Sequence, residues 1–364
     1  MHHATELPLH GGRAPRWLFG RMVRLSRAIS EVMLDDFGAD ELVTRLSDPN
    51  WFQALACAIG YDWHSSGTTT VTIGALREAL NDSNEIYVAG GKGKAGLNTP
   101  FDIEKGTELL SISKSAEELK ETSRLAAKVD SALVYDNLGI YQHSMIFSRR
   151  KWSVVQQGMS REGRMAVRFQ WLSDSIDKGD IANEPHSGMR SNRHSTSMDL
   201  TDSRNSWARE SSIDMLGEYR KMLSVKSYPS RHPIIRSMDM SKRAADAIDR
   251  ARELEPKDYR ELMLVKGIGR ATLRSLAFVS SLIYDRELAY RDPVMFAYNL
   301  GGKDGIPFKV NRKTYDSVCG SLEGIIENAR IEGDEKYGAL KRLSREIWNE
   351  PLVPNFASGY ENGR

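Results

Sequence analysis

Residues 262–273 read Leu-Met-Leu-Val-Lys-Gly-Ile-Gly-Arg-Ala-Thr-Leu, and this stretch decides how the C-terminal half is organised. Apolar residues at helical spacing lead up to the glycines and resume after them, which predicts one helix on either side. Gly267 and Gly269 flank Ile268 between the two helices. Because glycine allows positive φ and close approach to its backbone, the sequence predicts a tight turn in which Ile268 fills an apolar joint.

The start of the second helix suits a negatively charged ligand, since a helix N-terminus attracts phosphate. From residue 257 to 286 there are six Lys or Arg and three acids. This is the helix-hairpin-helix pattern of proteins that hold nucleic-acid backbones without reading bases, and an ordinary helical corner is the alternative. If the turn lies on the surface, changing both glycines to Val should weaken binding with little loss of fold. The predicted contact residues are Lys266, Gly267, Ile268, Gly269, Arg270 and Thr272.

The composition is that of a folded protein. The 364 residues leave room for two or three domains, and 40% of them are hydrophobic. The net charge is +2, from 51 basic and 49 acidic residues. A nucleic-acid surface must therefore be a local basic patch.

Cysteine usage and hydropathy bound the environment. Cys57 and Cys319 are the only cysteines, and they form neither a disulfide framework nor a zinc site. No run approaches the roughly 18 apolar residues of a membrane span, and the N-terminus lacks a signal-peptide layout. We therefore expect a cytoplasmic protein with no membrane partner.

The periodicities predict an α+β protein. A mixed α/β domain, residues 1–200, contains a strand at 86–89 and a hairpin of strands at 140–147 and 152–156. It ends in a polar stretch, 177–205, that we interpret as a long loop. An all-helical domain, residues 201–364, follows; it carries the helix-hairpin-helix at 257–283 and ends in a mobile tail.

One predicted helix favours self-association. Residues 207–223 carry an apolar face beside the polar stretch, so this face needs a covering surface. Its own domain is one such surface. A homodimer is the preferred interpretation, because two hairpins would increase avidity for one strand.

A glycine-rich segment follows the first strand. Gly90 to Lys94 could surround a phosphate with backbone amides, and Lys92 and Lys94 would add positive charge. The segment lacks the spacing of a P-loop. An exposed basic turn is the alternative, and a nucleotide-binding enzyme is a third functional hypothesis.

A polar block lies between two apolar segments. Asp62 and His64 form the best pair for a metal or a general base, because carboxylate and imidazole bind Mn²⁺ or zinc. The hydroxyls that follow could contact a phosphate, although helix N-capping would also explain them. The hydroxyl residues in question are Ser65, Ser66 and Thr68.

Other polar residues could join this chemistry. Phosphodiester cleavage needs an activated water and stabilised negative charge, often through carboxylate-held Mg²⁺ or Mn²⁺ with a nearby lysine. Sequence spacing leaves open whether the candidates converge. The catalytic candidates are Asp62, His64, Lys92, Lys128 and Asp130; the metal candidates are Asp62, His64, Asp130, Glu184 and His186, and His143 is a further titratable group.

Several strings together resemble one family. These strings include residues 62–70, 90–94, 127–132, 154–159, 184–186 and 310–315. On these strings the chain is similar to the prokaryotic, largely archaeal family catalogued as domain of unknown function 763. The resemblance implies nucleic-acid processing, with nuclease activity on DNA and RNA as the attached proposal.

These observations favour a metal-dependent nuclease that uses Mg²⁺ or Mn²⁺ on DNA, RNA or both. The hairpin would hold the backbone, and the N-terminal polar residues would perform the chemistry. A non-catalytic nucleic-acid-binding or scaffolding protein is the rival hypothesis.

Overall fold

A five-stranded antiparallel sheet forms the centre of the molecule, with its strands in chain order. The computed structural model describes residues 14, 16–60, 66–112, 116–135, 138–161, 165–176, 180–191, 195–223, 242–294 and 312–348. The strands are β1 (Tyr87–Lys92), β2 (Leu138–Phe147), β3 (Trp152–Ser160), β4 (Ala166–Leu172) and β5 (His186–Ser191). A short pair, β6 (Ser197–Met198) and β7 (Tyr290–Arg291), makes a second sheet.

The first helices cover one face of the sheet. Val88, Ile146 and Val155 project from this face into a core shared with these helices. Asp48 starts α3 by accepting hydrogen bonds from the amides of Asn50 and Trp51, at 2.6 and 3.1 Å. The helices are α1 (Arg16–Phe37), α2 (Ala39–Leu46), α3 (Pro49–Ala58) and α4 (Ser66–Leu80).

A second core fills the opposite face of the sheet. Successive side chains of a strand alternate between faces, so Tyr87 and Ala89 point away from Val88 and into this core. The first elements here are α5 (Lys94–Leu97), α6 (Thr99–Leu109), α7 (Ala116–Val129) and the π-helical turn η1 (Asp130–Val134). Beyond them come α8 (Ser206–Leu223), α10 (Lys242–Leu254), α11 (Tyr259–Leu264) and α12 (Arg270–Tyr284), and the short 3₁₀ turns are η2 (Ser173–Ser175) and η4 (Ser203–Asn205).

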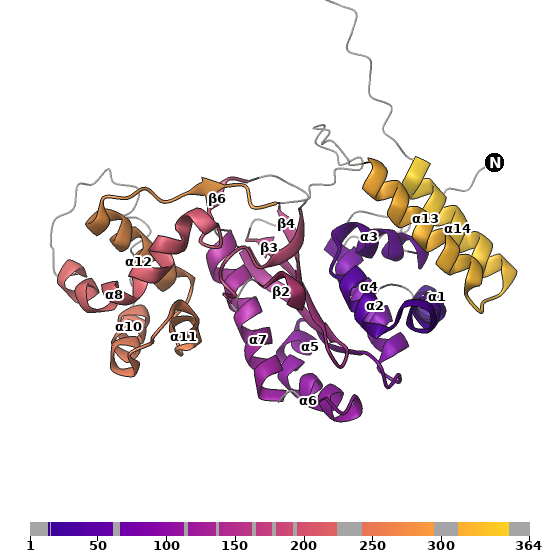
Figure 1. Ribbon diagram of the computed structural model, residues 1–364, viewed down its shortest axis with the longest axis horizontal. Helices are drawn as coiled ribbons and strands as arrows, with labels where there is room; N and C mark the ends of the chain where they lie inside the picture. The colour runs from indigo at the N-terminus through magenta and orange to yellow at the C-terminus, as the bar shows by residue number, and fades with distance from the viewer. Residues whose placement is uncertain are drawn as a thin grey trace, which may run out of the picture.

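The last two helices return to the first face. In Figure 1, α13 (Arg312–Asn328) and α14 (Gly333–Trp348) lie beside α1 and α3, across the sheet from α8 and α10–α12. Arg342 of α14 donates two hydrogen bonds to the carbonyl of Ala58, at 3.2 and 2.7 Å. The α+β class predicted from the sequence is confirmed, with helices on both faces of one sheet.

The interpretation of residues 177–205 as a long loop was wrong. This stretch contains β5, which pairs with β4 from Val167–Ser191 to Trp171–His186. Its polar composition hid the strand, because one face of β5 packs beneath α3 while the other face contributes Met189 to the core. The strand pattern therefore lacked a continuous apolar side.

The apolar face of α8 is covered within the chain. α8 packs against α12, α10 and α11, and Met215 and Leu216 belong to the core. Trp207 also packs there, and the Arg286 guanidinium lies 4.8 Å from its ring centroid. The apolar face from which the homodimer was predicted is therefore covered within the chain. The homodimer itself stays a prediction.

Hydropathy gives one further result. Among the described residues, no helix combines the length and the apolar character needed to cross a membrane.

Candidate functional site

The helix-turn-helix predicted around residue 267 is present. Asp258 caps α11 by accepting a hydrogen bond from the amide of Glu261 at 2.8 Å, and α12 begins at Arg270. Gly267 has a φ of +96°, and Ile268 is 1% exposed, as expected for an apolar plug. Gly269 occupies the N-cap of α12, so no side chain caps this helix.

The turn is attached to the rest of the protein. Lys128 of α7 donates to the carbonyl of Ile268, and Arg250 of α10 donates twice to the carbonyl of Lys266, at 3.2 and 3.1 Å. Arg270 reaches back to the carbonyls of Ser131, at 2.7 Å, and Leu138. We call Lys128, Arg250, Lys266 and Arg270 the hairpin joint, since these cations surround the turn.

Because the turn packs against the rest of the protein, the two glycines do not tolerate side chains equally. A Cβ on Gly267 would lie 2.8 Å from Nη2 of Arg250 and 3.0 Å from Cβ of Ala247. At Gly269 the nearest atom would be 4.0 Å away. The expectation that both glycines could become Val with little loss of fold was therefore wrong for Gly267, whose φ also disfavours a side chain.

The predicted nucleic-acid contacts differ in accessibility. Lys266, Gly267 and Lys94 are exposed. Thr68 and Thr272 are only 1% and 2% exposed, so in this conformation their hydroxyls lie inside the protein.

Part of the glycine segment continues strand β1. Gly90 to Lys92 pair with β2, where Gly91 lies opposite His143. The amide of Gly90 donates to Asp102 Oδ2 at 3.0 Å, and the amide of Gly93 donates to the carbonyl of Tyr141 at 2.9 Å. These two amides are therefore used within the fold. Lys92 and Lys94 remain exposed at this end of the sheet.

Asp130 and His186, distant in sequence, meet in the core. Nε2 of His186 lies 2.6 Å from Oδ1 of Asp130, while Oδ2 accepts from Gln156 at 2.5 Å and from Trp171 at 3.0 Å. Asp130 is fully buried and His186 is 4% exposed. Burial raises the pKa of Asp130, and the contacts with His186 and Trp171 only partly oppose this shift.

The polar network continues across the sheet to α7. Oε1 of Gln156 lies 2.8 Å from Nδ1 of His143, and Nε2 of His143 lies 2.6 Å from Oγ of Ser123. With Nδ1 protonated toward the glutamine oxygen, Nε2 accepts from the serine hydroxyl. Burial lowers the pKa of His143, so the neutral ring is favoured.

The predicted metal residues do not form one centre. Glu184 is paired with Arg291 at 3.0 Å. Both oxygens of Asp130 and Nε2 of His186 are engaged, so this pair does not fit a metal in its present arrangement. Over the described part of the chain, no three His, Cys, Asp or Glu residues are grouped to hold a metal ion.

Asp62, His64 and Ser65 lie outside the described residues. Ser66 is described only as the first residue of α4. The direction of α4 is fixed by Asn81, which exchanges hydrogen bonds with Val88, and by Arg77, which donates to the carbonyl of Gly90 at 2.9 Å. Because these contacts make α4 antiparallel to β1, α4 begins toward the Lys92 end of the strand.

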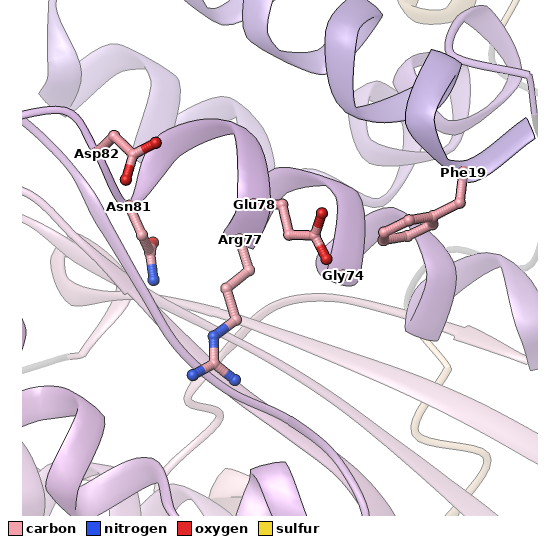
Figure 2. A pocket seen from close by; sticks show the side chains of 6 residues that line it. All are labelled: Phe19, Gly74, Arg77, Glu78, Asn81 and Asp82. Atoms are coloured by element: carbon pink, nitrogen blue, oxygen red, sulfur yellow. The ribbon is translucent and has the colours of Figure 1, made fainter. Parts of the chain in front are cut away.

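A polar pocket lies between α1 and α4. Figure 2 shows Arg77 directed toward the sheet, while the Glu78 carboxylate is directed toward the side on which Phe19 of α1 lies. Arg77 is already engaged with Gly90 and with Asp102, at 2.9 Å each. Glu78 and Asp82 also line this pocket, and their negative charge disfavours a phosphate ligand.

Comparison with known proteins supports the family resemblance. A family model described as "Protein of unknown function (DUF763)" matches residues 3–310. Since this match spans most of the chain, the protein belongs to that family. No curated protein and no solved structure matches the chain. The matched residues end before α13.

Sequence reasoning missed the residues that connect the titratable groups. Gln156 and Trp171 bind Asp130, and Ser123 binds His143. Gln156 lies in one of the family-like strings, but glutamine and tryptophan carry no titration signal. Only the strand register shows that Gln156 lies opposite His143.

Proposed function

We propose that this protein is a nucleic-acid processing enzyme, most simply a metal-dependent nuclease, that holds DNA or RNA backbone at the hairpin joint. The observation that carries this proposal is the chemistry of the joint's contacts. Lys128 and Arg250 donate to backbone carbonyls of the turn, which are neutral. These contacts position the two cations without cancelling their charge.

The start of α12 adds to this positive region. Gly269 supplies no capping side chain, and Lys266 is exposed beside it. Backbone phosphates are attracted both by cations and by the N-terminus of a helix. Such contacts position a nucleic acid without reading its sequence.

The proposed chemistry remains with Asp62, His64 and Lys92. α4 begins toward the Lys92 end of β1, and Asp62 and His64 precede that helix by four and two residues. His64 would take a proton from water, and Lys92 would offset developing charge. In this proposal, Asp62 and His64 would be the residues that bind Mg²⁺ or Mn²⁺.

Because Asp130 and His186 are already hydrogen-bonded to each other in the core, one alternative function is favoured. If the polar residues near the sheet serve only the fold, the protein is a non-catalytic nucleic-acid-binding or scaffolding protein. Both functions use the hairpin joint, and they differ in whether the backbone is cut.

Cleavage assays separate the two functions. Labelled single- and double-stranded DNA and RNA are incubated with the full chain, with Mg²⁺, Mn²⁺ or EDTA. We expect metal-dependent cleavage that falls by about 10²–10⁴-fold in His64→Ala, and comparably in Asp62→Asn, with oligonucleotide binding retained. Asp82→Asn removes an exposed carboxylate beyond the other end of α4 and should cleave like the wild type.

Binding without cleavage under every metal condition would support the scaffolding alternative. Cleavage that survives in both Asp62→Asn and His64→Ala would move the catalytic site elsewhere in the protein.

A further inference from the structure

Two exposed apolar side chains lie on the helices that follow β1. Leu97 is the last residue of α5 and is 81% exposed, and Phe101 lies in the first turn of α6 and is 58% exposed. The inner side of α6 serves the core, where Ile103 is fully buried. Isolated exposed apolar residues are common on protein surfaces, so the neighbours of these two decide what they indicate.

Lysines flank the two apolar residues along one side of the helices. The amide of Asn98, between α5 and α6, donates to the Lys94 carbonyl at 3.2 Å, so helical hydrogen bonding continues from one helix into the next. Residues spaced three or four apart therefore lie on the same side. Four exposed residues follow this spacing, and we call them the exposed stripe: Lys94, Leu97, Phe101 and Lys105.

The lysines lie close to aromatic rings. Nζ of Lys105 lies 4.6 Å from the ring centroid of Phe101. Lys92, which precedes the stripe at the end of β1, is also exposed, and its Nζ lies 6.0 Å from the ring centroid of Tyr141. Within the described ranges, neither lysine forms an ion pair with a carboxylate.

Most of the negative charge of α6 is already paired. Asp102 is buried and forms an ion pair with Arg77 at 2.9 Å, and Glu104 forms one with Lys120. The remaining acid, Glu108, lies in the last turn of α6, at the end remote from α5. The α5 end of the exposed stripe is therefore positively charged.

An exposed ring between lysines suits a single strand of nucleic acid. An unpaired base can stack on the ring, and the lysines attract the phosphates on either side of it. A duplex offers phosphates, but its bases are stacked on one another, so the ring contributes to binding only where bases are unpaired.

A membrane surface fits the exposed stripe less well. A helix that lies on a membrane buries a continuous apolar face among the lipids. Here Leu97 and Phe101 lie between lysines, and α6 also exposes Glu104 and Glu108, which anionic lipids would repel.

The exposed stripe begins beside the residues proposed for catalysis. α5 follows Lys92 closely, and α4 begins toward this same end of β1. α7, which carries Lys128 of the hairpin joint, packs against both α6 and α11. In Figure 1, α5 and α6 lie at the bottom of the view with α7 between them and α11, well apart from α13 and α14.

We infer that the exposed stripe binds a single-stranded stretch of nucleic acid, with an unpaired base stacked on Phe101 and the adjoining phosphates at Lys94 and Lys105. This inference rests on the proposed function, and it narrows the substrate to DNA or RNA with unpaired bases near the cleaved bond.

The test measures binding of the full chain to a labelled oligo(dT) strand and to a DNA duplex of equal length, in EDTA. Phe101→Ala should weaken binding of the single strand by about 5- to 150-fold, the loss expected for one base–aromatic stack, and should leave duplex binding unchanged. Phe101→Trp keeps a stacking surface and should bind the single strand at least as tightly as the wild type. An abasic strand keeps the phosphates without the bases, so Phe101→Ala should bind it as the wild type does.

Tyr337→Ala is the matched control. Tyr337 on α14 is 68% exposed, and Nζ of Lys341 lies 5.9 Å from its ring centroid, so this pair resembles Phe101 and Lys105. The first turn of α14 carries Asp334 and Glu335 where the exposed stripe has a lysine and a leucine. Tyr337→Ala should therefore bind both the single strand and the duplex as the wild type does.

The outcomes separate this inference from the proposed function. Equal single-strand binding by Phe101→Ala and a wild type that binds nucleic acid would overturn the inference and leave the proposed function standing. A wild type that binds neither the strand nor the duplex would contradict the proposed function and the inference with it.

Two further results would overturn the stacking role of Phe101. Equal losses for strand and duplex in Phe101→Ala would show that the ring does not act through unpaired bases. Binding to phosphatidylserine vesicles that requires Phe101, with unchanged binding of the strand, would assign the exposed stripe to a membrane surface. If Phe101→Ala does not fold, Phe101→Leu, which keeps an apolar side chain without the ring, replaces it in each comparison.

Discussion

At the scale of single residues, His143 shows how the fold controls a titratable group. Its ring is held between Ser123 and Gln156, and Gln156 is fixed in turn by the buried Asp130. A base oriented by a third group is the arrangement found in nucleophilic active sites. The same contacts also satisfy every member of a buried network, which makes a structural role sufficient here.

His143 should make stability depend on pH. Burial lowers the pKa of its ring below the ordinary value of 6.5, so the folded protein binds this proton less tightly than the unfolded chain. The stability it contributes is therefore present above pH 6.5 and is lost as the pH falls through that value toward the folded pKa.

Between pH 6.5 and 5, we expect the free energy of unfolding to fall more steeply in the wild type than in His143→Gln. The difference in slope should reach at most about 1.4 kcal/mol per pH unit. Urea unfolding at several pH values measures it. Parallel slopes in the two proteins would show that His143 does not bind its proton differently in the folded state.

At the scale of elements, the hairpin turn separates two glycines with different roles. Gly267 needs positive φ and lies against Arg250, whereas Gly269 is extended and has open space beside it. Gly267→Ala should therefore reduce the free energy of unfolding by roughly 1–2 kcal/mol or more. Gly269→Ala serves as the matched control and should change it by less than about 1 kcal/mol.

Urea unfolding of the two alanine variants checks this difference. Equal losses would contradict the assigned conformation of the turn.

Local patterns predicted the elements but not their partners. The glycine turn, the helices beside it and the β2–β3 hairpin follow from periodicity over neighbouring residues. β5 did not, because its polar residues are matched by α3 and β4 rather than by its own pattern. The proximity of Arg168 and Arg190 was equally hidden, since these residues become neighbours only through strand register.

At the scale of the whole molecule, one sheet separates two polar regions. Arg168 and Gln170 face the N-terminal helices, where they donate to the carbonyls of Pro49 and Leu46, while the Asp130 network and the hairpin joint lie on the side of α7. Asp130 and His186 could be proposed from sequence as titratable candidates, but their contact depends on a π-helical turn meeting an edge strand. Asp62 and His64 lie outside the described residues, and their catalytic role stays a prediction.

The hairpin joint is the central claim, because both proposed functions require it. Lys266 is an exposed member of the joint whose side chain is not used to hold the turn in the contacts described above, so Lys266→Gln removes one phosphate contact without disturbing the buried plug. Lys341→Gln changes an exposed lysine on α14, across the sheet, and is the control of equal charge.

The most direct measurement is the salt dependence of oligonucleotide binding, followed by fluorescence anisotropy for the wild type and these two variants. Plotted as log K against log salt concentration, the slope should become shallower in Lys266→Gln by about 0.9 for duplex DNA and about 0.7 for a single strand. The weakening should be similar for unrelated sequences, and Lys341→Gln should keep the wild-type slope. A Lys266→Gln slope equal to that of the wild type, or an equal loss in Lys341→Gln, would contradict backbone binding at the hairpin joint.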